Sequence, residues 1–312
     1  MIFLHDAPDY SDLLAIVGRE QSIDPALIEK DYWIMHCLYG LQQMGLKFEL
    51  KGGTSLSKGF GIIDRFSEDI DIQIAPTDDL PVGKNHMKEK HVEARRSFFD
   101  NLAAEISIPG IVSVERDMAF DNEKMRSAGI RLTYASQNSI PSGVKEGVLL
   151  EAGFDQVTPN TPCDFSSWAY DKAVESGVTG LIDNRAIGVP CYNPEYTLVE
   201  KLHAISRKYR RQQEEGSLPQ NFMRHYYDVY CLLGGDVVQK FIGTTDYYSH
   251  KESKFSGNDE PDLSKNPAFI LKDVETRKIY KDAYMRTRAL YFKDMPEFDD
   301  ILEMIKHNAS KL

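Results

Sequence analysis

The spacing of hydrophobic residues predicts two helices at the start of the chain, over residues 11–19 and 24–43. In the second, Asp24 is followed by Pro25, the usual order of a capping residue and a proline in the first helical turn. Three consecutive charges lie in the middle of this helix: Glu29, Lys30 and Asp31. Their simplest interpretation is a solvent-exposed face.

Alternating apolar and polar residues predict strands in the next part of the chain, with a helix over 86–106 among them. The predicted strands cover residues 47–51, 68–75, 110–117, 127–135 and 146–155. A short helix is expected over 54–59, between the first two strands. Strands and helices in this order predict an α+β sheet domain in the first half of the chain.

From residue 194 onward the hydrophobic pattern is that of helices. The predicted helices cover residues 194–212, 221–233, 271–293 and 296–308. Residues 243–267 are polar and rich in Gly, Ser, Pro and Asn, so we expect a long exposed loop there. We therefore expect two domains, a sheet domain over 1–190 and a mainly helical domain over 191–312.

Composition narrows the class of protein. The net charge of −11 argues against a protein that coats nucleic acid without regard to sequence, although it leaves room for a local basic groove. The first residues carry an acid where a signal peptide needs basic residues, and no apolar run is long enough to span a membrane. The four cysteines are scattered and include no C-x-x-C pair, which predicts reduced thiols and no zinc site. A cytoplasmic protein without a membrane segment is expected.

The strongest chemical signal lies in residues 51–74, KGGTSLSKGFGIIDRFSEDIDIQI. Asp69 and Asp71 alternate with isoleucines in a predicted strand, so both carboxylates project from the same face. Two neighbouring carboxylates stay ionised together when a cation lies between them. The glycines of the G-G-T turn leave room for a phosphate beside backbone N–H groups. This combination is typical of metal-assisted phosphoryl chemistry, and the segment matches neither the Walker A loop nor the dinucleotide fingerprint.

Several residues outside this segment could complete such a site. Glu151 follows an apolar run and could be a third carboxylate from a neighbouring strand, with Asp155 a weaker candidate; an ordinary exposed strand acid is an equally good interpretation. Lys201 lies beside the apolar stripe of its helix and could neutralise a triphosphate. Asp228 lies among aromatic and apolar residues and needs a partner, for which Arg224 is the expected choice.

A basic run on the same helix as Lys201 could contact a polynucleotide backbone, although solvated helix charge is the default interpretation. Its members are Arg207, Lys208, Arg210 and Arg211.

Four ordered blocks of the sequence resemble the AbiEii/AbiGii-type nucleotidyltransferase-like toxins of the DNA polymerase β-like superfamily. The blocks are K-G-G-T-S-L-S-K at 51–58, R-F-S-E-D-I-D-I at 65–72, E-K-L-H-A at 200–204 and R-H-Y-Y-D-V-Y at 224–230. The early I-E-K-D-Y-W is similar to the family as well. The resemblance implies a nucleotidyltransferase-like mixed or antiparallel sheet domain with flanking helices. It also implies that a helical C-terminal domain follows and closes the active-site cleft.

The resemblance assigns roles to individual residues. The implied nucleotide-binding residues are Gly52, Gly53, Thr54, Ser55, Lys58 and Lys201. The implied metal ligands are Asp69 and Asp71, with Glu151 as a possible third, and the implied catalytic set is Asp69, Asp71, Lys201 and Asp228. Where the family often has R-D-x-x-D, this chain has His225 in the second position.

The implied function is the transfer of a nucleoside monophosphate from an NTP to an acceptor hydroxyl, with Mg²⁺ or Mn²⁺ as the cofactor. The protein would be the toxin of a bacterial toxin–antitoxin or phage-defence system. Its acceptor would be an RNA such as a tRNA 3′ end, and its antitoxin would be encoded nearby. Two alternatives stay open: a nucleotidyltransferase that modifies a protein or small molecule, and a non-catalytic nucleotide-binding interaction protein.

Overall fold

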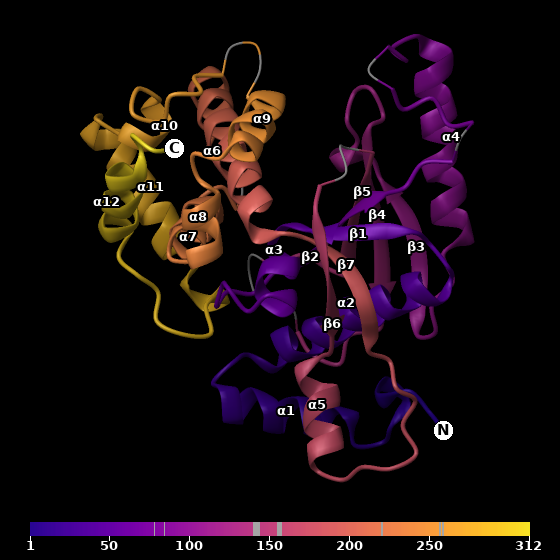
Figure 1. Cartoon of the computed structure of the whole chain (residues 1–312). Helices are drawn as coiled ribbons and strands as arrows, with labels where there is room; N and C mark the ends of the chain where they lie inside the picture. The colour runs from indigo at the N-terminus through magenta and orange to yellow at the C-terminus, as the bar shows by residue number, and fades with distance from the viewer. Residues whose placement is uncertain are drawn as a thin grey trace. The chain divides into compact units, whose positions relative to one another are not determined.

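The chain is described from a computed structural model (Figure 1). The structure describes residues 1–77, 79–83, 85–139, 144–154, 158–219, 221–255, 257 and 259–312. Asp155 lies outside these residues. The chain forms two compact units, and a short early segment belongs to the second of them. The sheet unit consists of Met1–Phe60 and Phe66–Tyr192, and the helical unit of Gly61–Arg65 and Asn193–Leu312.

Within the described residues, seven strands form one mixed sheet in the order β3-β4-β5-β2-β1-β7-β6. The strands are β1 (Phe48–Lys51), β2 (Asp69–Ile74), β3 (Ile111–Asp117), β4 (Ser127–Tyr134), β5 (Val148–Gly153), β6 (Asn160–Phe165) and β7 (Ala186–Tyr192). Strands β2 and β5 are parallel, as are β1 and β7, and the other neighbours are antiparallel. The mixed sheet with helices beside it confirms the predicted α+β fold class. The sequence pattern had indicated neither β6 nor β7.

Three of the four longer helices described in the sheet unit begin close to where the sequence predicts them. The four are α1 (Tyr10–Gln21), α2 (Pro25–Gln43), α4 (Glu89–Glu105) and α5 (Trp168–Glu175), of which α5 was not predicted. The Asp24 side chain accepts a hydrogen bond of 2.9 Å from the Ala26 N–H and so caps α2, as predicted.

The middle of α2 contradicts its sequence interpretation. Glu29, Lys30 and Asp31 are at most 2% exposed, so the expected solvent-exposed face is wrong. Apolar residues surround nearly the whole circumference of α2, and such a helix is buried on every side. Its charges are compensated by groups from distant segments, which a helical periodicity cannot reveal.

The helical unit contains the remaining longer helices (Figure 1). They are α6 (Pro194–Glu215), α7 (Arg224–Leu233), α8 (Asp236–Phe241), α9 (Thr245–Lys254), α10 (Pro267–Ile270), α11 (Val274–Met285) and α12 (Phe298–Asn308). Helix α7 packs against α6 and α12, and its Tyr226 is fully buried. None of the described helices combines the length and hydropathy that crossing a membrane requires.

The predicted loop over 243–267 is wrong, because α9 lies within it. The Thr244 hydroxyl caps this helix by accepting a hydrogen bond of 3.2 Å from the Tyr247 N–H. Tyr247 is fully buried and anchors the helix in the unit. His250 of the same helix is buried as well. A mostly polar helix with only two buried side chains has too weak a periodicity to be recognised in the sequence.

Candidate active site

The carboxylate strand β2 has one half-exposed face and one buried face. Asp69 and Asp71 lie on the half-exposed face, whereas Ile70 and Ile72 are fully buried on the other. Parallel pairing of β2 with β5 puts Asp71 in register with Glu151. Register partners in a sheet project from the same face, so the carboxylates of Asp69, Asp71 and Glu151 share one face of two adjacent strands.

Burial and neighbouring charges disfavour ionisation of Asp69. Burial raises its pKa to about 6, and the nearby charge of Asp71 contributes in the same direction. The ammonium of Lys145 acts in the opposite direction, with its Nζ 3.9 Å from Asp69 Oδ1. A carboxylate in these surroundings is stabilised by a further positive charge.

The donor set fits a hard divalent cation that shares its coordination with a substrate. Among the described residues, no group of three or more His, Cys, Asp and Glu side chains is placed so that it could hold a metal ion. Mg²⁺ is typically held by one or two carboxylates, with phosphate oxygens and water as further ligands. Asp69 and Asp71 on one face of β2 are two such carboxylates.

The glycine turn lies directly against the carboxylate strand. Gly52 has a φ of +76°, and a Cβ on it would lie 2.1 Å from Asp71 Oδ2. The Thr54 hydroxyl donates a hydrogen bond of 2.6 Å to the carbonyl of Asp69, and the Ser55 hydroxyl donates one of 3.0 Å to the carbonyl of Gly52. The Thr54 side chain therefore ties the turn to β2, and the Ser55 side chain closes the turn on itself. Gly53 is buried in the same turn.

The ammonium of Lys58 has partners in α2 and α5. Its Nζ lies 2.7 Å from Asp31 Oδ1 and 4.0 Å from the centre of the Trp168 ring. Asp31 also accepts a hydrogen bond of 2.8 Å from the Trp168 N–H. The ammonium predicted to bind nucleotide thus forms an ion pair with α2.

Asp228 lies in the helical unit and is fully buried. Its carboxylate receives two hydrogen bonds of 2.7 Å from the Arg65 guanidinium, and Lys201 Nζ lies 2.8 Å from Oδ2. Burial alone would raise the pKa of Asp228, but the positive charges of Arg65 and Lys201 outweigh burial and hold it well below its usual range. Sequence reasoning named Arg224 as the partner and missed Arg65, whose only signal was its place at the head of the R-F-S-E-D-I-D-I block.

His225, at the position where the family often has an acid, is held neutral. Burial lowers its pKa well below the usual range, and the positive charge of Lys201 adds to this effect. A neutral imidazole at this position adds no charge to the cluster. The carboxylate beside the Lys201 ammonium is that of Asp228.

The basic run on α6 is partly neutralised by the protein. Arg210 pairs with Asp259, and Arg211 lies 2.8 Å from Glu215. Arg207 is exposed. Because Arg210 and Arg211 already have carboxylate partners, the run carries less free charge than its sequence indicates.

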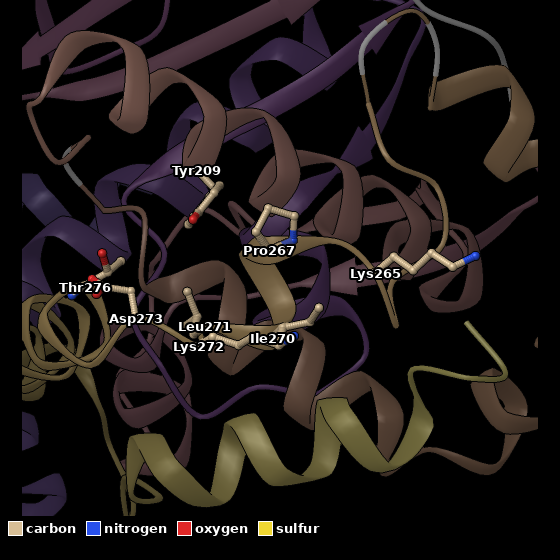
Figure 2. A pocket seen from close by; sticks show the side chains of 8 residues that line it. All are labelled: Tyr209, Lys265, Pro267, Ile270, Leu271, Lys272, Asp273 and Thr276. Atoms are coloured by element: carbon tan, nitrogen blue, oxygen red, sulfur yellow. Dashed lines mark hydrogen bonds between the residues drawn. The ribbon is translucent and has the colours of Figure 1, made fainter.

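The helical unit also contains a cavity of about 310 Å³ (Figure 2). It lies between Tyr209 of α6, the α10 residue Pro267, Leu271, and the start of α11 at Thr276. None of the predicted catalytic, metal or nucleotide-binding residues lines this cavity.

A mixed sheet that carries a glycine turn against a carboxylate strand is the arrangement of a nucleotidyltransferase-like domain. Residues 36–304 match the family model described as "Nucleotidyl transferase AbiEii toxin, Type IV TA system". The chain belongs to this family. It is therefore a nucleotidyltransferase toxin of a type IV toxin–antitoxin system, with a nucleotide substrate and a cognate antitoxin.

The family match begins after the buried charges of α2, at residue 36. No curated protein and no solved structure matches the chain.

Proposed function

We propose that this toxin transfers a nucleoside monophosphate from an NTP to the 3′-terminal hydroxyl of an RNA, with tRNA as the preferred acceptor. The observation that carries the proposal is the shared face of Asp69, Asp71 and Glu151 beside the Gly52 turn. These carboxylates would hold Mg²⁺ or Mn²⁺. When bound, the ions supply charge neutralisation for the phosphates and lower the pKa of the attacking hydroxyl.

The glycine turn positions the strand for this chemistry. Because a side chain at residue 52 would overlap Asp71, glycine there lets the carboxylate lie against the turn. The hydroxyl of Thr54 ties the turn to the backbone of Asp69. We infer that the backbone N–H of Gly53 binds a phosphate. The hydroxyls of Thr54 and Ser55 hold the turn in position for this contact.

Lys201 is the residue of the helical unit that we assign to the triphosphate. Its ammonium is 2.8 Å from Asp228, which also binds Arg65, so a buried carboxylate fixes the position of the charge. Arg65 precedes Asp69 by only four positions in the chain. The segment that pairs with Asp228 therefore leads directly into the carboxylate strand.

An RNA acceptor is favoured over a small molecule by the basic residues on α6. Arg207 is exposed, and we assign it and Lys208 to the RNA backbone. Arg210 and Arg211 would join them only by leaving their carboxylate partners. Modification of tRNA in the cytoplasm would stop translation, which suits both a toxin and a phage-defence protein.

The proposal is tested by supplying purified protein with each labelled NTP, Mg²⁺ and total cellular RNA. Label is expected in RNA of tRNA size, with release of pyrophosphate. Asp71→Asn should reduce the rate by at least about 10²-fold, and EDTA should abolish it. Glu115→Gln, which alters an exposed acid on the edge strand β3, is the matched control.

Other outcomes would contradict the proposal in different ways. Label on protein or on a small molecule would identify a different acceptor class. NTP binding without pyrophosphate release, together with growth inhibition that survives Asp71→Asn, would indicate a non-catalytic interaction protein.

A further inference from the structure

Two adjacent charges of α2 hold residues that lie between β4 and β5. The Glu29 carboxylate accepts hydrogen bonds of 2.7 Å and 3.1 Å from the backbone N–H groups of Gln137 and Asn138. The ammonium of Lys30, the next residue, donates to the carbonyl of Lys145. Buried charges are expensive unless they are paired, so the fold keeps them here for the contacts they make.

The backbone of Lys145 is held on both sides by one buried ion pair. Its N–H donates a hydrogen bond of 3.1 Å to Glu68 Oε2, and its carbonyl accepts from Lys30. Lys30 and Glu68 are themselves paired at 3.7 Å, and their side chains are 3% and 1% exposed. A residue outside the regular strands is thus fixed in place by two charged residues from elsewhere in the fold.

The side chain of Lys145 reaches the carboxylate strand. Its Nζ lies 3.9 Å from Asp69 Oδ1 and 4.5 Å from the centre of the Phe120 ring, which supports the ammonium through a cation–π contact. The side chain is 22% exposed, so the ammonium remains accessible. Lys58, one of the two lysines that the family resemblance assigns to the nucleotide, pairs with Asp31.

We propose that Lys145 contacts the β- and γ-phosphates of the NTP, and that Lys30 and Glu68 are positioning residues that hold it there. This inference rests on the proposed function. As the acceptor oxygen bonds to the α-phosphorus, the bridging oxygen leaves with its electron pair as pyrophosphate, and the hydroxyl proton passes to water. A fixed ammonium beside the leaving phosphates stabilises the charge that collects on them.

A count of charges supports this assignment. Three carboxylates and a triphosphate carry more negative charge than two divalent ions neutralise. Lys145 is a cation already held within 4 Å of the strand that carries two of these carboxylates. Its lysine stem is long enough for the ammonium to turn from Asp69 to a phosphate oxygen without movement of the backbone.

The test compares Lys145→Met with Lys145→Arg in the RNA-labelling assay, with NTP and RNA concentrations varied separately. Lys145→Met should lower kcat/KM for NTP by about 10- to 100-fold, the usual effect of losing a hydrogen bond to a charged group. Inhibition by added pyrophosphate should weaken by a similar factor, while KM for RNA stays unchanged. Lys145→Arg should keep most of the activity, because it keeps the charge.

Lys172→Met is the matched control, since Lys172 belongs to the same unit and pairs with Glu20 on the surface. It should behave as the wild type. Lys30→Met should weaken pyrophosphate inhibition as Lys145→Met does, and combining the two changes should add little further loss. A merely structural role for Lys30 would give additive losses and leave pyrophosphate inhibition unchanged.

Wild-type kcat/KM and wild-type pyrophosphate inhibition in Lys145→Met would overturn the inference. If the wild type labels RNA and Asp71→Asn does not, that result leaves the proposed function standing. If the wild type labels no RNA, the proposed function fails. Direct binding of a non-hydrolysable NTP analogue to the wild type and Lys145→Met then decides the role of Lys145 by itself.

Discussion

Gly52 and Asp71 are in such close contact that a Cβ on Gly52 would lie 2.1 Å from Asp71 Oδ2. Gly52 also has a φ of +76°, a conformation that side-chain-bearing residues rarely adopt. Glycine is therefore required at position 52 for two reasons: its backbone conformation disfavours a side chain, and the Asp71 carboxylate occupies the place where a Cβ would lie.

Gly52→Ala is expected to displace the Asp71 carboxylate and to reduce nucleotide transfer severely. Gly45→Ala is a matched control, because Gly45 has the same φ of +76° but no atom within 4 Å of a Cβ position. The control should cost about 1–2 kcal/mol of stability from backbone strain and leave transfer unaffected. Equal activities of the two variants, measured with labelled NTP, would show that the contact with Asp71 has no role in transfer.

Glu151→Gln should weaken the response to Mg²⁺. Its register with Asp71 on β5 makes it the third carboxylate of the shared face. Removal of one negative ligand should raise the Mg²⁺ concentration for half-maximal activity and lower the maximal rate, measured by titration at saturating NTP. Glu115→Gln serves as the control strand acid. An unchanged Mg²⁺ titration for Glu151→Gln would remove Glu151 from the metal site.

Asp228→Asn should destabilise the helical unit by about 3–5 kcal/mol, because it leaves Arg65 and Lys201 as buried cations without their carboxylate. Urea denaturation followed by circular dichroism measures the change. Arg211→Met, which breaks an exposed pair with Glu215, should cost no more than about 0.5 kcal/mol. A stability loss as small as that of the control would mean that the buried cluster contributes little.

Stability should fall as the pH drops from about 6.5 toward 4, in part because of His36. Its Nε2 lies 2.9 Å from the carbonyl of Pro109 and its Nδ1 3.0 Å from Asn184 Nδ2, a pairing that suits the neutral ring. Burial lowers its pKa to about 4. Protonation then favours the unfolded chain, so a contribution of up to about 3 kcal/mol is complete above pH 6.5 and lost as the pH falls through 4.

His36→Gln can make the same two hydrogen bonds but does not titrate. Its free energy of unfolding, measured from pH 4 to 7, should therefore have a smaller slope than that of the wild type. Equal slopes would assign the acid sensitivity to other groups.

Local sequence patterns were sufficient to predict the elements that are specified by a few neighbouring residues. The Asp24 cap, the proline that begins α2 and the alternation of Asp69 and Asp71 with isoleucines each lie within a few residues. The same patterns missed α9, whose residues are mostly polar, and they missed β6 and β7. Short strands gain their stability from pairing with partners far away in the chain, which no local window contains.

The buried charges of α2 show that local sequence patterns have the same limit at the candidate site. The I-E-K-D-Y-W segment has an ordinary appearance for a surface helix, yet Glu29, Lys30 and Asp31 are buried against residues more than 25 positions away. The partners of two lysines, Lys58 and Lys145, likewise come from distant parts of the chain. Each ammonium lies beside the carboxylate that the fold brings to it.

The sequence alone determined the family, the carboxylate strand and the glycine turn, because these signals lie in contiguous blocks of residues. Tertiary structure alone decided the partners of the charged groups: Glu151 beside Asp71, Arg65 on Asp228 and Lys145 beside Asp69. Coulomb interactions act through space and fall off with distance, whereas spacing along the chain does not fix the distance between two charges. Only the folded chain sets those distances, and the distances decide which charged groups pair with one another at the site.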